Sequence, residues 1–168
     1  MVTIAYLADH PDVIPTLADW FRTQWPAYYA QQTQANIEQE FHSEAIRDGI
    51  PLRLVAFESS ELAGTIVLRE RALWTLPEYR PGLGGLYVNK TLRGRGIGTE
   101  LVRAGMITAR NQGYDMVFAT TVLASGILER LEWERITSVL HHGEQLAVYR
   151  CVLNRRGPTP APADRASP

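Results

Sequence analysis

A short basic turn with alternating glycines contains the residues of this sequence that are best suited to bind an anion. Gly94, Gly96 and Gly98 alternate here with other residues, among them Arg95, and Arg93 precedes them. Glycine lacks a Cβ, so the backbone can turn sharply and approach a ligand closely. The residues that follow predict a helix, and the first N–H groups of a helix have no partner within it. With the helix dipole and two guanidinium groups, the turn predicts a phosphate-binding site.

The spacing of the glycines argues against two common nucleotide sites. The dinucleotide pattern requires Gly-x-Gly-x-x-Gly, and the phosphate loop of nucleotide hydrolases ends in Gly-Lys-Ser or Gly-Lys-Thr. Neither pattern is present. The sequence instead has Arg-x-x-Gly-x-Gly, formed by Arg93, Gly96 and Gly98, directly after an apolar strand. Glycines that only tighten a turn are the simpler alternative, but the basic residues and the helical pattern favour a binding site.

The composition limits the classes of partner. A chain of 168 residues with a net charge of −1 suits one domain with a sizeable core and carries no general field for nucleic acid or membrane. The single cysteine, Cys151, argues against an internal disulfide and a cysteine zinc site, and indicates a cytoplasmic setting. The four histidines lack metal-ligand spacing, so no metal is expected. We expect no signal peptide and no membrane span.

The hydrophobic periodicity predicts an α/β fold with a mixed sheet. The Leu83 and Met116 strands flank a helix and should be parallel, whereas the other neighbouring strands form hairpins. Residues 1–154 are expected to form a single domain, and the Pro/Ala-rich residues 155–168 a disordered tail. The expected strands are Val2–Leu7, Leu52–Phe57, Leu62–Leu68, Leu83–Val88, Met116–Thr121, Trp133–Leu140 and Gln145–Leu153, and the expected helices are Pro11–Trp25, Gln34–Arg47, the segment from Ile97 to Gly113, and Ala124–Leu131.

The strand, turn and helix around Arg93, Gly96 and Gly98 resemble the acetyl-CoA-binding motif of the GNAT N-acetyltransferase superfamily. The order of elements also matches the GNAT acyl-CoA N-acyltransferase fold, a mostly antiparallel mixed sheet flanked by helices, over most of Val2–Leu153. The resemblance implies acetyl-CoA as cosubstrate and transfer of its acetyl group to a primary amine by direct attack. The cofactor-binding residues that it implies are Leu86, Tyr87, Val88, Arg93, Gly94, Arg95, Gly96, Ile97, Gly98 and Thr99. Among these, the N–H of Val88 would donate to the thioester oxygen.

Direct attack would require a free amine, and the sequence offers few groups to deprotonate one. An amine of pKa about 10.4 must give up a proton at a cost of about 4–5 kcal/mol at neutral pH, so a general base is useful. The strand beginning at Pro81 has no acid, and Glu78 is the nearest carboxylate; a solvated loop charge is its alternative interpretation. Glu38, Glu40 and Glu44 lie on the helix that borders the acceptor in the family, and could attract a cation or form a solvated face.

The acid that would protonate the leaving thiolate is missing from its expected place. Many GNAT proteins carry a tyrosine where this sequence has Leu128. Thr120, Thr121, Ser125 or a water could replace it, and a thiolate also leaves tolerably without help. Leu128 therefore keeps open a different class of function, a non-catalytic acyl-CoA-binding or sensor module.

The expected acceptor is a small-molecule amine. Aromatic rings, which attract cations, gather where the family binds its acceptor, or else support the core. Acetylation of a protein is the other alternative, but the long Arg69–Gly82 loop would crowd a peptide. The acyl group, acetyl or another, stays open, as does the choice between monomer and homodimer. The aromatic residues are Trp20, Trp25, Tyr28, Tyr29, Trp74 and Tyr79.

Overall fold

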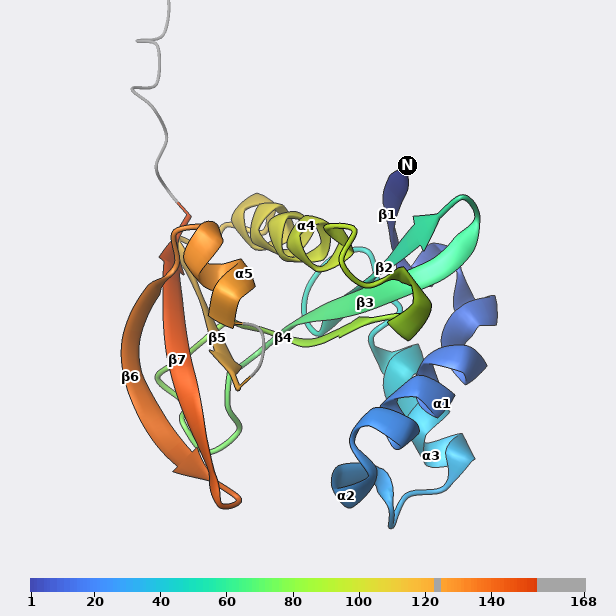
Figure 1. Ribbon diagram of the computed structural model, residues 1–168, viewed down its shortest axis with the longest axis horizontal. Coiled ribbons are helices and arrows are strands. Elements are labelled where there is room, and N and C mark those ends of the chain that lie inside the picture. The colour runs from blue at the N-terminus through green and yellow to red at the C-terminus, as the bar shows by residue number, and fades with distance from the viewer. Residues whose placement is uncertain (123–124, 154–168) are drawn as a thin grey trace, which may run out of the picture.

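The computed structural model describes residues 1–122 and 125–153, and these form a seven-stranded mixed sheet flanked by helices (Figure 1). The strand order is β1-β2-β3-β4-β5-β7-β6. The strands are β1 (Val2–Tyr6), β2 (Leu52–Glu58), β3 (Glu61–Arg69), β4 (Gly82–Val88), β5 (Met116–Thr121), β6 (Glu134–His141) and β7 (Glu144–Val152). The helices are α1 (Ile14–Gln24), α2 (Pro26–Tyr29), α3 (Gln34–Ser43), α4 (Ile97–Asn111) and α5 (Ser125–Arg130), with 3₁₀ turns at Leu7–Asp9, Pro11–Val13 and Lys90–Leu92.

Helices cover both faces of the first four strands, and the alternation of side chains along each strand sorts them between two cores. Leu52 and Leu54 of β2 belong to the core that contains the buried face of α4. Val55 belongs to the second core, with Phe21 of α1 and Phe41 of α3. Helix α4 therefore lies on one face of the sheet, and α1 and α3 lie on the other.

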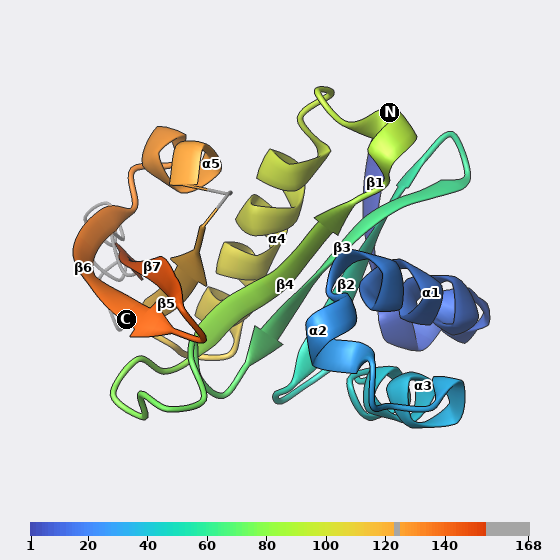
Figure 2. The same ribbon diagram turned by 60° about the horizontal axis from the view of Figure 1, so that its bottom comes forward.

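The sheet divides into two wings because β4 and β5 separate. They are paired in parallel only at Gly82 and Phe118 within the described residues, whereas β5 pairs with β7 along its whole length. Figure 2 shows β4 and β5 close together at one end and apart at the other. The result is a V-shaped opening between a first wing, β1–β4, and a second wing, β5–β7.

The predicted fold class and the parallel pair are confirmed, and most strand bounds agree to within a residue or two. The helix predicted over Gln34–Arg47 is wrong at its end, because the chain turns at Glu44, whose carbonyl accepts a hydrogen bond from the N–H of Arg53. The helix predicted over Pro11–Trp25 begins as a 3₁₀ turn at Pro11–Val13 and ends at Gln24, and Pro26 then begins the separate helix α2, since proline suits the first helical position.

Two further expectations concern the ends of segments. Arg69, expected to begin a loop, is the last residue of β3. The expected tail, 155–168, lies outside the described residues. Among the residues described, no helix is long and apolar enough to cross a membrane.

Candidate active site

The glycine turn forms an open cradle at the start of α4. Gly94 and Gly96 both have a φ of +81°, in the left-handed region that favours glycine, and Gly96 is the N-cap of α4. A Cβ placed on either residue would meet no atom within 4 Å. A ligand could therefore approach the backbone of the turn from this side.

The backbone N–H groups at the start of α4 are available to such a ligand. The first helical hydrogen bond of α4 runs from the N–H of Glu100 to the carbonyl of Gly96, at 3.1 Å. The N–H groups of Gly96, Ile97, Gly98 and Thr99 precede that bond and have no carbonyl partner in the helix. Gly96 is also not capped by a side chain, so these donors and the positive end of the helix dipole suit an anion.

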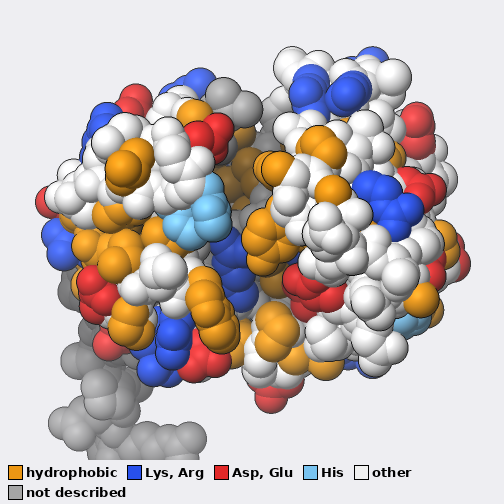
Figure 3. Space-filling view, turned by 90° about the horizontal axis from the view of Figure 1, so that it is seen from below, with side chains coloured by type: hydrophobic (Ala, Val, Ile, Leu, Met, Phe, Trp, Pro, Cys, Tyr) orange, Lys and Arg blue, Asp and Glu red, His pale blue; other side chains and the backbone are white. Residues whose placement is uncertain are grey.

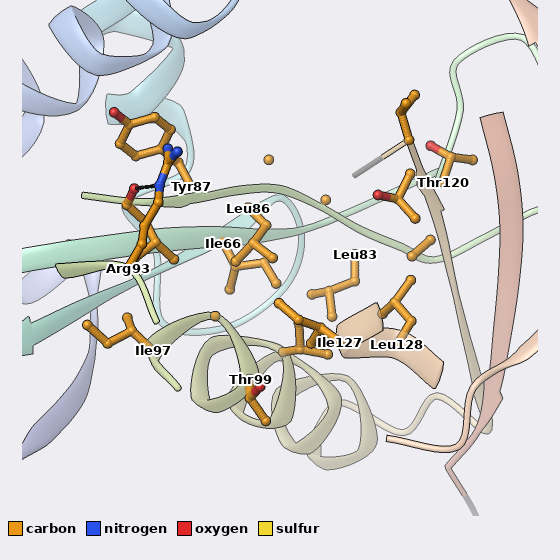
Figure 4. A pocket seen from close by; sticks show the side chains of 18 of the residues that line it. Ile66, Leu83, Leu86, Tyr87, Arg93, Ile97, Thr99, Thr120, Ile127 and Leu128 are labelled. Carbon is orange, nitrogen blue, oxygen red and sulfur yellow. Dashed lines mark hydrogen bonds between the residues drawn. The ribbon is translucent and has the colours of Figure 1, made fainter. Parts of the chain in front are cut away.

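The two arginines of the turn have different positions. Arg93 folds back over β4: its Nε donates to the carbonyl of Val88 at 3.0 Å and its guanidinium lies 5.5 Å from the centre of the Tyr87 ring (Figure 4). Arg95 instead points toward Glu58, with 3.5 Å between Nη1 and Oε1. Only the first of them faces the opening between the wings.

The backbone of β4 has donors that point into this opening. The N–H of Asn89 donates to the carbonyl of Ala63 at 2.7 Å, and Val88 is paired with Gly64. Since hydrogen-bonded and non-hydrogen-bonded pairs alternate in an antiparallel ladder, Val88 is at a non-hydrogen-bonded position and its N–H points away from β3. Nearer the start of the strand, a bulge at Gly85, whose φ is +58°, interrupts the pairing with β3.

A cavity of about 840 Å³ occupies the opening and joins these features. Figure 4 shows Arg93 and Ile97 at one end and Thr120 and Leu128 at the other. All of the predicted cofactor-binding residues except Arg95 line it. The other lining residues within the described part of the chain are Gln24, Trp25, Ile66, Leu83, Gly84, Gly85, Val102, Ala119, Thr120, Thr121, Val122, Ile127, Leu128, Arg130, Glu144 and Leu146.

The two predicted catalytic residues, Glu78 and Ser125, do not line this cavity. Glu78 is exposed on the loop between β3 and β4, and Ser125 begins α5. Leu128 does line it and is 4% exposed. Glu144, at the start of β7, is the carboxylate residue among the described lining residues, and sequence reasoning missed it because the β6–β7 hairpin lies far from the motif in the chain.

A buried ion pair lies behind β4, on the face covered by α1 and α3. Arg53 of β2 and Glu44 have side chains only 4% and 7% exposed, with 3.0 Å between Nη2 and Oε2. The guanidinium also donates to the hydroxyl of Thr65 at 3.2 Å and lies 4.7 Å from the centre of the Phe41 ring. A lone arginine within the apolar strand predicted over 52–57 was the signal for this pair, since a buried charge requires a partner.

The three glutamates expected on one helix have different environments. Glu44 is not part of a solvated face; it is the C-cap of α3 and pairs with Arg53. Glu40 keeps much of its side chain exposed, but partial burial of its carboxyl, together with the charge of Glu44, raises its pKa. Glu38 accepts a hydrogen bond from Gln34 at 3.5 Å.

The aromatic residues also separate. Trp20 and Trp25 pack against Tyr87, with 5.1 Å and 6.3 Å between ring centres, next to the mouth of the cavity that Trp25 lines. Tyr29 is buried in the second core, whereas Trp74 is 81% exposed. In the described part of the chain, no three His, Cys, Asp or Glu side chains are grouped so that they could hold a metal ion.

Several solved structures have a fold similar to that of this chain. An N-acetyltransferase from Staphylococcus aureus Mu50 matches with a TM-score of 0.69 and 18% identity, covering 91% of this chain and 99% of that one. An aminoglycoside 6'-N-acetyltransferase complexed with coenzyme A matches with a TM-score of 0.68 and 16% identity, covering 92% and 99%. RimL, a ribosomal L7/L12 alpha-N-protein acetyltransferase in complex with coenzyme A, matches with a TM-score of 0.67 and 13% identity, covering 90% and 94%.

The TM-scores of these structures show a common fold, and the family model adds a relationship in sequence. No curated protein matches the sequence significantly. The model of the acetyltransferase (GNAT) family, however, matches residues 14–126, which is more than half of the chain and includes α1 to β5 with the whole cradle. The chain therefore belongs to the GNAT family of acetyltransferases.

Proposed function

We propose that this protein is an N-acetyltransferase that transfers the acetyl group of acetyl-CoA to a primary amine of a small molecule by direct attack. The observation that carries the proposal is the continuity of the cavity. It runs from the free N–H groups at the start of α4, along β4, to the gap in front of β5. The phosphates of acetyl-CoA would lie at the start of α4, its extended arm along β4, and its reacting thioester toward β5.

The residues of the cradle fit the phosphates of coenzyme A. The backbone of Gly94 and Gly96 is open, and the N–H groups of Gly96 to Thr99 converge with the dipole of α4. Arg95 lines no part of the cavity and pairs with Glu58, so we assign it to the outer edge of the phosphate site, where its charge acts through solvent.

The separated strand β4 fits the remaining part of the cofactor. Beyond Gly82, the backbone groups on its edge toward β5 are unpaired within the described residues, and they can pair with the amides of an extended arm. When bound, acetyl-CoA supplies an acetyl thioester at the end of this arm. The N–H of Val88 points into the opening at the cradle end of β4, beside Arg93, so it is suited to donate to a carbonyl of the arm. The thioester would lie further along β4, toward the end where β4 and β5 meet.

The site offers fewer groups for proton transfer than for binding the cofactor. The amine nitrogen bonds to the acetyl carbon, the carbon–sulfur bond breaks, the amine loses a proton and the thiolate gains one. Glu144 lines the cavity and is therefore better placed than Glu78 to accept the amine proton, directly or through water. Leu128 cannot donate a proton, so the thiolate would take one from Thr120 or Thr121 of the cavity wall, or from water.

A small amine suits the acceptor side better than a protein segment. The chain between β3 and β4 contains a bridge between Leu73 and Leu76 and the exposed Trp74, and it stands beside the closed end of the opening. Such a loop leaves little room for an extended peptide. The fold neighbours include enzymes for both kinds of acceptor, so likeness of fold does not choose between them.

The direct test offers acetyl-CoA and a library of primary amines to the purified protein and measures the release of coenzyme A thiol. We expect release with a subset of small amines and a matching acetylated product by mass spectrometry. Tight binding of coenzyme A without turnover of any amine would instead support the acyl-CoA sensor, which Leu128 in the cavity wall motivates. Turnover of peptides alone would support a protein acetyltransferase.

A further inference from the structure

Among the described residues, Arg69 has no carboxylate in direct contact behind β4, although it stands on the same face as the Arg53–Glu44 pair. Ile66 and Leu68 of β3 point into the core under α4, so Arg69 points to the opposite face, as Thr65 does. Arg53 is matched by Glu44 at 3.0 Å. Within residues 1–122 and 125–153, Arg69 makes no ion pair.

The hydrogen bonds of Arg69 leave one edge of its guanidinium open. Nε donates to the carbonyl of Arg71 at 3.1 Å and Nη2 donates to the carbonyl of Ala72 at 3.2 Å. These two bonds hold the side-on edge of the guanidinium against the loop. A guanidinium has five N–H donors, so Nη1 and the second hydrogen of Nη2 remain to form an end-on fork.

The open fork lies beside the cavity. A Cβ on Gly84, which lines the cavity, would lie only 2.6 Å from Nη2 of Arg69, so the absence of a side chain there gives the guanidinium its place. The hydroxyl of Thr120, another lining residue, donates at 3.3 Å to the same carbonyl of Ala72 that Arg69 contacts. Arg69 is thus next to the closed end of the opening, where β4 and β5 meet.

The charges around Arg69 favour an additional anion. Burial of the guanidinium, and then the positive charge of Arg53, lower the pKa of Arg69. A partly buried cation without a carboxylate in direct contact is costly, even though Glu44 acts on Arg69 from a greater distance, and a bound anion would offset that cost. Glu40 is near enough for its charge to interact with that of Arg69, which places a carboxylate on the same face. In Figure 3, basic side chains are visible within the hollow between the two wings, and acidic ones border it.

We propose that Arg69 binds a carboxylate of the acceptor, so that the acceptor is an amine that also carries a carboxylate, as an amino acid does. The two oxygens of a carboxylate match the two parallel donors of an end-on guanidinium fork. Glu40, whose charge interacts with that of Arg69, would supply the opposite charge for the ammonium group. The inference rests on the proposed function, because it specifies the amine that the acetyl group reaches.

The test compares matched sets of three amines that differ only at the carboxylate: an amino acid, its primary amide and its decarboxylated amine. With acetyl-CoA, we expect kcat/KM to be about 10- to 100-fold higher for the acid members, since hydrogen bonds to charged groups are among the stronger ones. R69Q should abolish this preference by lowering kcat/KM for the acids alone. R71Q is the matched control, because Arg71 carries the same charge but lies over Trp74, and it should keep the preference.

Equal kcat/KM values for acids, amides and decarboxylated amines in the wild-type protein would overturn the inference and leave the acetyltransferase intact. The wild-type comparison needs no variant, so it decides the matter even if R69Q unfolds. If no amine of any kind is acetylated, the proposed function fails. Calorimetry of the same compounds on the protein saturated with coenzyme A then decides the inference: tighter binding of the acids supports it, and equal binding overturns it.

Discussion

The two sides of β4 are built from different parts of the polypeptide. On the side of α4, the cradle presents backbone N–H groups and glycines with open space around them, so its binding groups belong mainly to the backbone. On the side of α1 and α3, the surface behind β4 depends on charged side chains, namely Arg53, Glu44 and Arg69. A substitution in a site made of backbone groups can change ligand affinity with little effect on the stability of the fold. A substitution of a buried charge is expected to change both the stability and the site. Substitutions on the two sides should therefore affect different measurements.

The largest expected effect is on stability, from breaking the buried pair. E44A leaves the guanidinium of Arg53 buried without its carboxylate, and we expect the free energy of unfolding to fall by about 3–5 kcal/mol. Urea unfolding measures it. E100Q is the control, because Glu100 and Arg103 form an exposed pair, whose loss should cost at most about 1 kcal/mol. Equal costs for the two variants would show that the buried pair does not brace this side of β4.

Next in size is the loss of cofactor binding from the cradle. G96D places a negative charge among the N–H donors at the start of α4, and we expect the Kd for coenzyme A to rise at least about 100-fold, or about 2.7 kcal/mol. Isothermal titration calorimetry measures it. G113D is a matched control at the other end of α4, since Gly113 also has a positive φ, +89°, and open space around it. We expect similar melting temperatures for the two variants; unchanged coenzyme A affinity in G96D would refute the cradle assignment.

A smaller effect is expected where the cavity lacks an acid. L128Y would introduce a hydroxyl into the cavity wall, and we expect kcat to rise about 10-fold, short of the full range of general acid catalysis. The larger ring should also lower stability by about 1–3 kcal/mol, because Leu128 is buried. L128F carries the same ring without the hydroxyl, and separates the two effects. An equal kcat in L128Y and L128F would contradict the role of a missing acid.

The smallest effect concerns Glu40, whose pKa is raised by partial burial and then by Glu44. The folded protein therefore binds this proton more tightly than the unfolded chain does, and the resulting stabilisation is lost as the pH rises through the folded pKa. E40Q should be more stable than wild type by about 0.3 kcal/mol at pH 7, and no more stable at pH 3. Urea unfolding at both pH values measures the difference, with E38Q as the control for helix charge. A difference that is the same at both pH values would contradict the assignment.

The cradle and the fold class could be predicted from the sequence because both depend on neighbours in the chain. The glycines at 94 and 96 and the helix after them lie within a few residues of each other, so their spacing alone defines a helix N-terminus open to an anion. The strand and helix patterns were likewise local, and the hairpin across His142 and Gly143 followed from two adjacent segments. The family of the protein could therefore be predicted from local sequence patterns.

The tertiary structure decided everything that depends on which side chains meet. Sequence could not pair Arg53 with Glu44, turn Arg95 toward Glu58, or bring Glu144 to the cavity, because each contact joins separate elements across the sheet. The position of Arg69 beside Gly84 has the same cause: strand alternation and the register of β3 on β4 set its direction. A binding site made of backbone groups depends on neighbouring residues and can therefore be predicted from the sequence. The charged side chains that would select an acceptor come from separate strands, so their positions depend on how those strands pair.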